Sequence, residues 1–501
     1  MRMRIARSVS PGFWMRLLLG VMALGLFVFP LIRLLMLSLG AEDSSWSLDG
    51  YRLLVSDERA STAIVNTIYI SIASALISSF LGTLMAFLVG YTNIHYKKII
   101  EMLIFLPFVI PAYVMTISWT GLTSPGGALT LFLKELGLPG IDLPMAASAI
   151  AGGGVLAFLA DIDNFAVPAF LGISSNIPVL STYIYEKVIS FGPGSFEYGA
   201  VLSVVLSVIA LSGTLLAARL GKAVGEEESH HAESEARIIL KRPIRHGVEW
   251  MVLVFLLSIS VIPFCYMAVS ALLKTFNFSL RMEDMTWDNY RFVLTNDSVR
   301  EAAWNSLCMA GMGTMLCLLL GTWVAYHVVR RGNRMAIFVE QMAGMTYSVP
   351  GIVLALALIF YWSQPLPGLH TGLYGSYTIL ILGYVTRYMV VQIKNSAAAM
   401  QSMSRSAEEA AMVAGSSVFH MWIRIIIPQL AWPALSGSFF IFLSAFTELT
   451  MSSVMASTDT KTIGLTIFNL QQAGDYSLAA AVSSVILIVM MIGSLLRLLG
   501  K

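Results

Sequence analysis

The chain has 501 residues, of which 57% are apolar and only 12% charged, and its mean hydropathy is +0.77. In water-soluble proteins charged residues make up about a quarter of the chain, so this composition excludes a soluble globular fold and indicates a protein that lies in a lipid bilayer. The formal net charge of +2 comes without a basic stripe, so we expect no nucleic-acid partner.

The apolar runs predict helices that cross the membrane, which takes about 20 residues for ~30 Å of hydrocarbon. The first part of the chain has five such runs, at about 13–40, 63–91, 99–122, 146–168 and 198–220. The second part has six, at about 248–274, 305–329, 337–362, 373–393, 431–455 and 478–499. Because the runs are continuously apolar rather than alternating, helices are favoured over a barrel. We therefore predict an all-α integral membrane protein with about 11 transmembrane helices.

Basic residues indicate the orientation of the chain. Arg2, Arg4 and Arg7 precede the first span, which is too long for a signal peptide and has no cleavage site of the small-x-small kind. We interpret this span as an anchor and expect a cytoplasmic N-terminus. The basic turns at 97–98 and 330–334 are also expected in the cytoplasm.

The sequence contains an internal repeat. The segment that begins at Asp49 returns at Asp288, an offset of 239 residues, and the same offset relates Asn66 to Asn305 and Pro111 to Pro350. Further on, the offset becomes 284, between Pro144 and Pro428. The first half therefore lacks 45 residues, which correspond to about 383–427 of the second half.

This gap affects the predicted topology, because the loss of one crossing reverses everything that follows. The basic residues of the linker nevertheless favour a cytoplasmic position. Three explanations stay open: the stretch 127–141 re-enters the membrane, one segment of the first half does not span, or the chain is a shortened form of a longer ancestor. The predicted domains are a first repeat at 1–220 that lacks a coupling loop, a cytoplasmic linker at 221–247, and a second repeat at 248–501 that carries a polar loop at 395–430.

The polar loop of the second repeat carries the most specific motif. It reads Glu409-Ala410-Ala411, then Gly415 after three residues, and, after nine more, Ile425, Ile427 and Pro428. This resembles the E-A-A-x3-G-x9-I-x-L-P signature of binding-protein-dependent ABC importer permeases, and the single departure is isoleucine for leucine at Ile427.

The residues themselves predict a helix, a turn and a second helix. Ser406 is expected to cap a short helix whose alanines allow another surface to approach closely, and Gly415 is expected to end it. A second helical piece is predicted from Val418 to Ile426, before Pro428 leads into the next span. An interfacial loop without a partner is the alternative.

The resemblance implies a fold of two tandem type I importer repeats, similar to the fused iron(III) transport permeases, in the bacterial inner membrane. It implies an ABC ATPase subunit in two copies and a periplasmic solute-binding protein as partners. In the family the helical loop docks into a groove of the ATPase, which implies a coupling role for Glu409, Ala410, Ala411, Gly415, Ile425, Ile427 and Pro428. The family has one such loop in each half, whereas this sequence has one in all, so transport competence is an open question.

No enzymatic site is predicted. The sequence has no Gly-x4-Gly-Lys-Ser/Thr motif, so ATP hydrolysis would take place on a separate chain. We found no Ser/His/Asp, zinc or paired-carboxylate arrangement at catalytic spacing, and we predict neither a cofactor nor a bound metal.

Acidic residues inside apolar segments are costly and are usually functional. We therefore predict a translocation pathway lined by Asp161, Asp163, Asn164, Thr447, Glu448, Pro111 and Pro350. In the alternative interpretation the acids are hydrated at the outer interface and the prolines serve packing alone. The resemblance to iron(III) permeases implies that the cargo is iron(III) or a similar small solute. The choice stays open because permeases for thiamine, polyamines, phosphonates and sulfate share the architecture.

Two other functions stay open. An ion-gradient-driven secondary transporter also uses repeats and intramembrane acids. A permease that no longer transports would result if the first half cannot couple.

Overall fold

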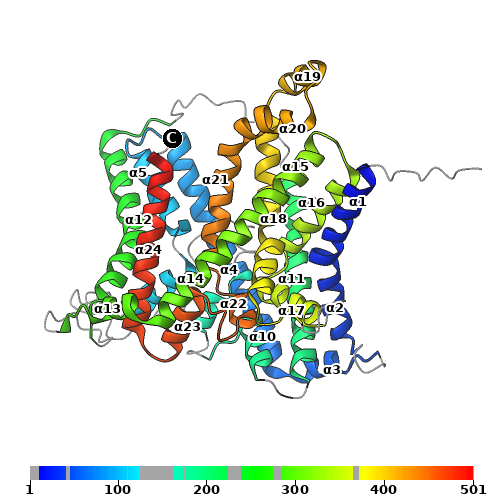
Figure 1. Cartoon of the computed structure of the whole chain (residues 1–501). Helices are drawn as coiled ribbons and strands as arrows, with labels where there is room; N and C mark the ends of the chain where they lie inside the picture. The colour runs from blue at the N-terminus through cyan, green and yellow to red at the C-terminus, as the bar shows by residue number, and fades with distance from the viewer. Residues whose placement is uncertain are drawn as a thin grey trace, which may run out of the picture. The chain divides into compact units, whose positions relative to one another are not determined.

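The computed structural model describes residues 11–40, 46–109, 111–123, 162–172, 176–190, 192, 194–223, 238–274, 284–364 and 372–499. These residues form helices joined by short turns, and within these ranges there are two isolated β-bridges but no strand (Figure 1). The predicted all-α class is confirmed.

Six of the described helices are long and apolar enough to cross a membrane: Leu17–Ser38, Glu58–Tyr91, Ser195–Leu215, Arg242–Ser270, Asp297–Val329 and Val418–Phe446. A seventh is obtained if the pair Arg334–Tyr347 and Gly351–Trp362, bent by 116°, is taken as one span. The protein is thus a multi-pass membrane protein. Fewer described helices meet this test than the 11 spans predicted.

Three of the differences have identifiable causes. The predicted span 146–168 lies mostly outside the described residues. The predicted span 99–122 is two helices, α5 (Lys97–Val109) and α6 (Ala112–Thr123), on either side of Pro111. The span 337–362 is likewise interrupted, at Pro350, because proline cannot donate a backbone hydrogen bond to the preceding turn.

The chain divides into two compact units that do not follow the order of the repeats. Unit 1 comprises residues 1–47 and 305–460, and unit 2 comprises 48–304 and 461–501. The boundary at 304 falls within α14 (Asp297–Leu316).

Unit 1 contains these elements: α1 (Pro11–Met22), the π-helical segment η1 (Ala23–Val28), α2 (Phe29–Ser38), η4 (Cys317–Gly321), α15 (Thr322–Val329), α16 (Arg334–Tyr347), α17 (Gly351–Trp362), α18 (Tyr377–Ser402), α19 (Ser406–Val413), α20 (Val418–Met421), η5 (Trp422–Ile426), α21 (Ile427–Phe446) and α22 (Ser452–Met455). The central helix is α18, which packs on η4, α15, α16, α17 and α21. Its buried side chains Met389 and Ile393 belong to the same apolar core as Val324 and Ala325.

Unit 2 contains, besides α5 and α6, the helices α3 (Asp49–Ser56), α4 (Glu58–Tyr91), α9 (Ala166–Leu171), α10 (Leu180–Ile189), α11 (Ser195–Ala223), α12 (Arg242–Ser270), α13 (Asp288–Thr295), α23 (Ile463–Gln472) and α24 (Tyr476–Leu499). Here α12 packs on α5, α6 and α24. The ring of Phe468 on α23 contacts Phe165, Phe170 and Tyr185, with ring centroids 5.3–6.0 Å apart.

The first helices of the two repeats are exchanged between the units. In unit 1, α1, η1 and α2 of the first repeat pack on α16 and α17 of the second. In unit 2, α12 of the second repeat packs on α5 and α6 of the first. Each unit is therefore built from both repeats.

Elements at the offset of 239 residues have matching bounds. Helix α3 corresponds to α13, and α6 corresponds to α17, residue for residue. The carbonyl of Pro111 accepts a hydrogen bond from the amide of Met115 at 3.2 Å, and that of Pro350 accepts one from Leu354 at 3.0 Å. Each proline thus starts a helix at the same point of its repeat.

A helix face that is covered in unit 1 is exposed in unit 2. Gly321 and Ala325 are buried, and a Cβ on Gly321 would lie 2.9 Å from Cβ of Gln392 on α18. Their counterparts Gly82 and Ala86 on α4 are exposed. This difference is what the 45-residue gap predicts, because the missing block corresponds to most of α18 and the loop after it.

Candidate functional site

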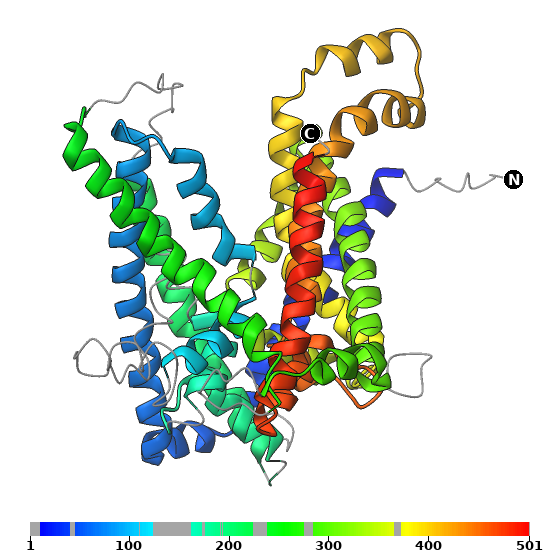
Figure 2. The ribbon, with the colours of Figure 1, turned by 90° about the vertical axis from the view of Figure 1, so that its left-hand side faces the viewer.

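The signature of the second repeat forms a helical elbow, by which we mean residues 403–428. Helix α18 leads into it, α19 and α20 form its two arms, and η5 continues from α20 into α21. Figures 1 and 2 show α19 and α20 beyond the ends of α15 and α18. The predicted second helical piece from Val418 to Ile426 is confirmed.

Gly415 forms the turn of the elbow. Its backbone φ is +78°, the left-handed conformation that glycine adopts without a steric penalty. Its amide donates to the carbonyl of Met412 at 3.0 Å, and the amide of Ser416 donates to the carbonyl of Ala411 at 2.9 Å. These two bonds make a Schellman motif, which closes a helix C-terminus. The prediction that Gly415 ends the helix is confirmed.

The predicted cap at Ser406 is wrong. Arg405 occupies the cap position and Ser406 is the first helical residue. The hydroxyl of Ser404 accepts a hydrogen bond from the amide of Ser406 at 3.2 Å, so it is Ser404 that stabilises this helix start. The second arm has its own cap, Ser417, whose hydroxyl accepts from the amide of His420 at 3.3 Å.

The signature residues lie on the outer side of the elbow. Five of them are exposed: Glu409, Ala410, Gly415, Ile427 and Pro428. Ala411 and Ile425 are partly buried. Large apolar side chains share this exposure, with Val413 89% and Phe419 69% exposed. An exposed apolar surface of this kind is typical of a contact with another protein or with the membrane.

Glu408, which the sequence did not single out, and Arg330 of the basic turn fix the elbow from the inside. Glu408 is the buried residue of α19, and its carboxylate contacts the guanidinium of Arg330. A signal was present, since Glu408 is adjacent to Glu409 and Arg330 lies in the basic turn. The pairing itself joins residues 78 positions apart and cannot be read from local spacing.

The predicted pathway residues of unit 1 have structural contacts. Glu448 is 6% exposed, and its two carboxylate oxygens accept from the amides of Met451 at 2.8 Å and Ser452 at 3.1 Å. The carboxylate thus caps the start of α22. Thr447, at the end of α21, donates its hydroxyl to the carbonyl of Leu443 at 2.9 Å. Pro350 is buried at the bend between α16 and α17.

The remaining pathway residues belong to unit 2 or lie outside the described ranges. Asp163 and Asn164 are partly buried, and the side-chain oxygen of Asn164 accepts from the amide of Val167 at 3.1 Å, near the start of α9. Pro111 is buried between α5 and α6. Asp161 lies outside the described residues. A pathway lined by these side chains stays a prediction.

The part of the chain that the structure describes contains no group of three or more His, Cys, Asp or Glu side chains able to hold a metal ion. The features to be explained are therefore the apolar spans and the elbow. Together they define the class, a multi-pass membrane protein with a helical elbow beyond the ends of α15 and α18.

Comparison with known proteins specifies this class further. Residues 317–500, from η4 to the end of α24, match the family described as the binding-protein-dependent transport system inner membrane component. The match includes the whole elbow. Over this segment the chain is similar to that family, and it resembles iron(III) transport permeases, as the sequence predicted.

The individual relatives have low sequence identity to this chain, and one of them matches nearly its whole length. The chain is 22% identical to the Fe(3+)-transport system permease protein FbpB 2 of Haemophilus influenzae, over 98% of both chains. It is 24% identical to the ferric transport system permease protein FbpB of Actinobacillus pleuropneumoniae, over 70% of this chain and 50% of that one. It is also 24% identical to the spermidine/putrescine transport system permease protein PotC of Escherichia coli K12, over 43% of this chain and 79% of PotC.

Among solved structures, a bacterial ABC transporter involved in the import of the acidic polysaccharide alginate covers 52% of this chain at 15% identity. The TM-score is 0.40, which is too low to support a statement about the fold. The family match and the apolar helices support a multi-pass inner-membrane protein with a transport role.

Proposed function

We propose that the chain is the permease subunit of an ATP-driven importer and that its elbow is the contact with a separate ATPase subunit. The observation that carries this proposal is the outward exposure of the signature residues together with Val413 and Phe419. A short helix held on its inner side and exposed on its apolar outer side is suited to dock into a groove. Movement of the ATPase would then reach α18 and α21, which flank the elbow in sequence.

The proposal includes the orientation and the partners. The elbow and the N-terminus lie in the cytoplasm, and a periplasmic binding protein delivers the cargo to the other side. The family description, binding-protein-dependent transport, supports such a partner. With one elbow, this chain offers one such contact to a pair of ATPase subunits.

The cargo that we propose is iron(III), presented by the binding protein. The support is the names of two relatives, both ferric transport permeases, one of which matches over nearly the whole chain. The spermidine/putrescine relative covers less of the chain and makes a polyamine the competing cargo.

Cysteine labelling tests the contact. The native cysteines Cys265, Cys308 and Cys317 are first replaced by alanine, and single cysteines are placed at Val413 in the elbow or at Val55 on α3, which are 89% and 83% exposed. In vesicles of both orientations, a membrane-impermeant maleimide should reach Val413→Cys only from the cytoplasmic side and Val55→Cys only from the periplasmic side. A bifunctional reagent should then link Val413→Cys, but not Val55→Cys, to the co-expressed ATPase.

Labelling of Val413→Cys from the periplasmic side would overturn the proposal. Transport is tested separately, by uptake of radioactive iron(III) or spermidine into vesicles with ATP, binding protein and an ionophore that collapses ion gradients. ATP-dependent uptake that survives the ionophore supports an ABC importer. Uptake that needs the gradient and no ATP supports a secondary transporter instead.

A further inference from the structure

The elbow is attached to the rest of unit 1 by a buried ion pair. Nε of Arg330 donates to Oε1 of Glu408 at 2.8 Å, and the two side chains are 6% and 10% exposed. Glu408 is the one buried residue of α19, whereas the neighbouring signature residue Glu409 is exposed. Adjacent carboxylates therefore face in different directions, one toward the protein and one away from it.

Backbone contacts reinforce this attachment on both sides. Nη2 of Arg330 donates to the carbonyl of Met403 at 3.2 Å, at the entrance of the elbow. In the reverse direction, Nη2 of Arg405 donates to the carbonyl of Val329 at 2.9 Å. Two arginines thus cross between the turn that joins α15 to α16 and the first arm of the elbow.

The segment η5, which follows the second arm, contacts the same helix α15. The ring of Trp422 in η5 lies 4.8 Å from that of Tyr326 in α15, measured between centroids, and Tyr326 is 5% exposed. The elbow is therefore held at Glu408, at Met403 and at Trp422, and all three contacts are with residues 326–330. A displacement of the elbow must move the α15–α16 turn with it.

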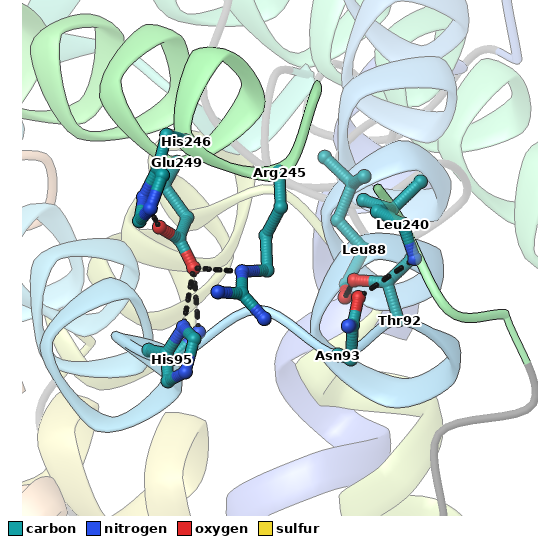
Figure 3. A network of polar contacts seen from close by, with 8 residues as sticks. All are labelled: Leu88, Thr92, Asn93, His95, Leu240, Arg245, His246 and Glu249. Carbon is teal, nitrogen blue, oxygen red and sulfur yellow. Dashed lines mark hydrogen bonds and ion pairs between the residues drawn. The ribbon is translucent and has the colours of Figure 1, made fainter. Parts of the chain in front are cut away.

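The same turn of the first repeat is used differently. At the offset of 239, Arg330 corresponds to Tyr91, which has no guanidinium to offer. The turn after Tyr91 is bound to the end of the linker and to α12: the amide of Leu240 donates to Oδ1 of Asn93 at 2.9 Å, and the amide of His95 donates to Oε1 of Glu249 at 2.8 Å (Figure 3). The repeat whose sequence lacks the signature thus also lacks an arginine at the matching position.

A buried ion pair is poor evidence for a purely stabilising role. Removing two charges from water costs several kcal/mol, which the attraction between them offsets only when the geometry is favourable, and well-packed apolar residues often stabilise as much. Such a pair contributes a defined geometry, because the N–H groups of the planar guanidinium donate hydrogen bonds to a carboxylate only in fixed directions. Here that geometry determines which way α19 presents Glu409.

We propose that Arg330 and Glu408 are positioning residues that hold the elbow rigidly on the α15–α16 turn, so that movement of the ATPase is transmitted to the membrane helices. This inference rests on the proposed function of the elbow. It assigns to Arg330 and Glu408 a role in coupling that is distinct from docking, which the exposed signature residues carry out.

The test compares transport with ATP hydrolysis in the complete complex reconstituted with the binding protein. For Arg330→Ala and Glu408→Ala we expect the number of cargo molecules moved per ATP to fall at least about tenfold, the factor that corresponds to ~1.4 kcal/mol. The exchange variant Arg330→Glu/Glu408→Arg restores an ion pair and should recover most of the ratio. The control is the more exposed pair of Arg59 and Glu186, 2.9 Å apart in unit 2, whose removal should leave the ratio unchanged.

The outcomes separate the two proposals. If the single variants keep the wild-type ratio, or if the exchange variant assembles but recovers nothing, the positioning role is refuted. Cross-linking of Val413→Cys in the same variants tests docking. Linkage that persists while the ratio falls supports the inference, and absence of any linkage even in the otherwise unchanged chain refutes the proposed function itself. Glu408→Gln, which keeps an acceptor at nearly the same volume, provides a folded variant if the alanine variants fail to assemble.

Discussion

Replacement of Gly415 tests whether the turn of the elbow must keep its left-handed conformation. At φ +78°, any residue with a Cβ is strained, at a cost of about 1–2 kcal/mol for alanine. No atom lies within 4 Å of the position that a Cβ would take, so the whole cost is backbone strain and none of it is a clash. A cost of this size shifts the equilibrium between the formed and the opened turn by a factor of about 5–30.

The assay is uptake by the reconstituted complex, with a matched control elsewhere in the chain. Gly474, between α23 and α24, has φ +85° and equally open space around the site of a Cβ, so Gly474→Ala carries the same strain outside the elbow. Gly415→Ala should reduce uptake several-fold, Gly415→Asn less, and Gly415→Val most, because asparagine tolerates this conformation and β-branched residues do not. Membrane insertion should be unchanged in all of them. Equal effects of Gly415→Ala and Gly474→Ala, or wild-type uptake in Gly415→Val, would refute the reasoning.

Three further predictions concern the scaffold. Burial raises the pKa of Asp57, but hydrogen bonds from two tyrosine hydroxyls and a backbone amide outweigh this and lower the pKa below its usual value. The ionised carboxylate of Asp57 therefore stabilises the fold above a pH of about 4, and this stabilisation is lost as the pH falls through the pKa of the folded state. In detergent, the thermal unfolding temperature of Asp57→Asn should be lower than that of wild type at pH 7, and the difference should shrink in acid. Gly321→Ala should destabilise unit 1, because the Cβ would lie 2.9 Å from Gln392, whereas Gly82→Ala at the exposed counterpart should be tolerated; thermal unfolding of the two variants checks this. Glu448→Gln should lower stability by about 1–3 kcal/mol, since one acceptor for a helix amide is lost, and a loss of transport at unchanged stability would instead support the predicted pathway role.

The elbow shows what local sequence can predict. The position of Gly415 and the spacing to Pro428 predict a helix, a turn and a second helix, because glycine at a helix end and proline in a first turn act locally. The cap was mistaken because Ser404 and Ser406 can both accept from a helix amide, and the choice between them depends on how the chain leaves α18. The ion pair to Arg330 depends on a contact between distant segments, which no local pattern encodes.

The bend at Pro350 and the role of Glu448 show a second limit of prediction from local sequence. A proline predicts a break, since it removes a backbone donor, but the angle of 116° between α16 and α17 follows from the packing of both helices in unit 1. An acidic residue in an apolar segment predicts a functional role, because burying a charged carboxylate in the membrane is energetically unfavourable. The unfavourable free energy of burying a carboxylate is also offset when it accepts hydrogen bonds from amides at a buried helix start, and Glu448 does so for α22.

The two repeats use one feature, the turn after their second long helix, for different purposes. In the second repeat this turn holds the elbow through Arg330, and in the first it binds the end of the linker through Asn93 and helix α12 through His95. The block that the repeat offset predicts to be missing would include both a covering helix and an elbow, and Gly82 and Ala86 are exposed where that helix would pack. Three differences between the repeats are therefore consistent with one another: the exposed face of α4, the partners of the turn after it, and the absence of the signature from the first repeat. We expect movement of the ATPase to enter through the turn of the second repeat, where Arg330 holds the elbow, because the turn of the first repeat is bound to Leu240 and Glu249 instead.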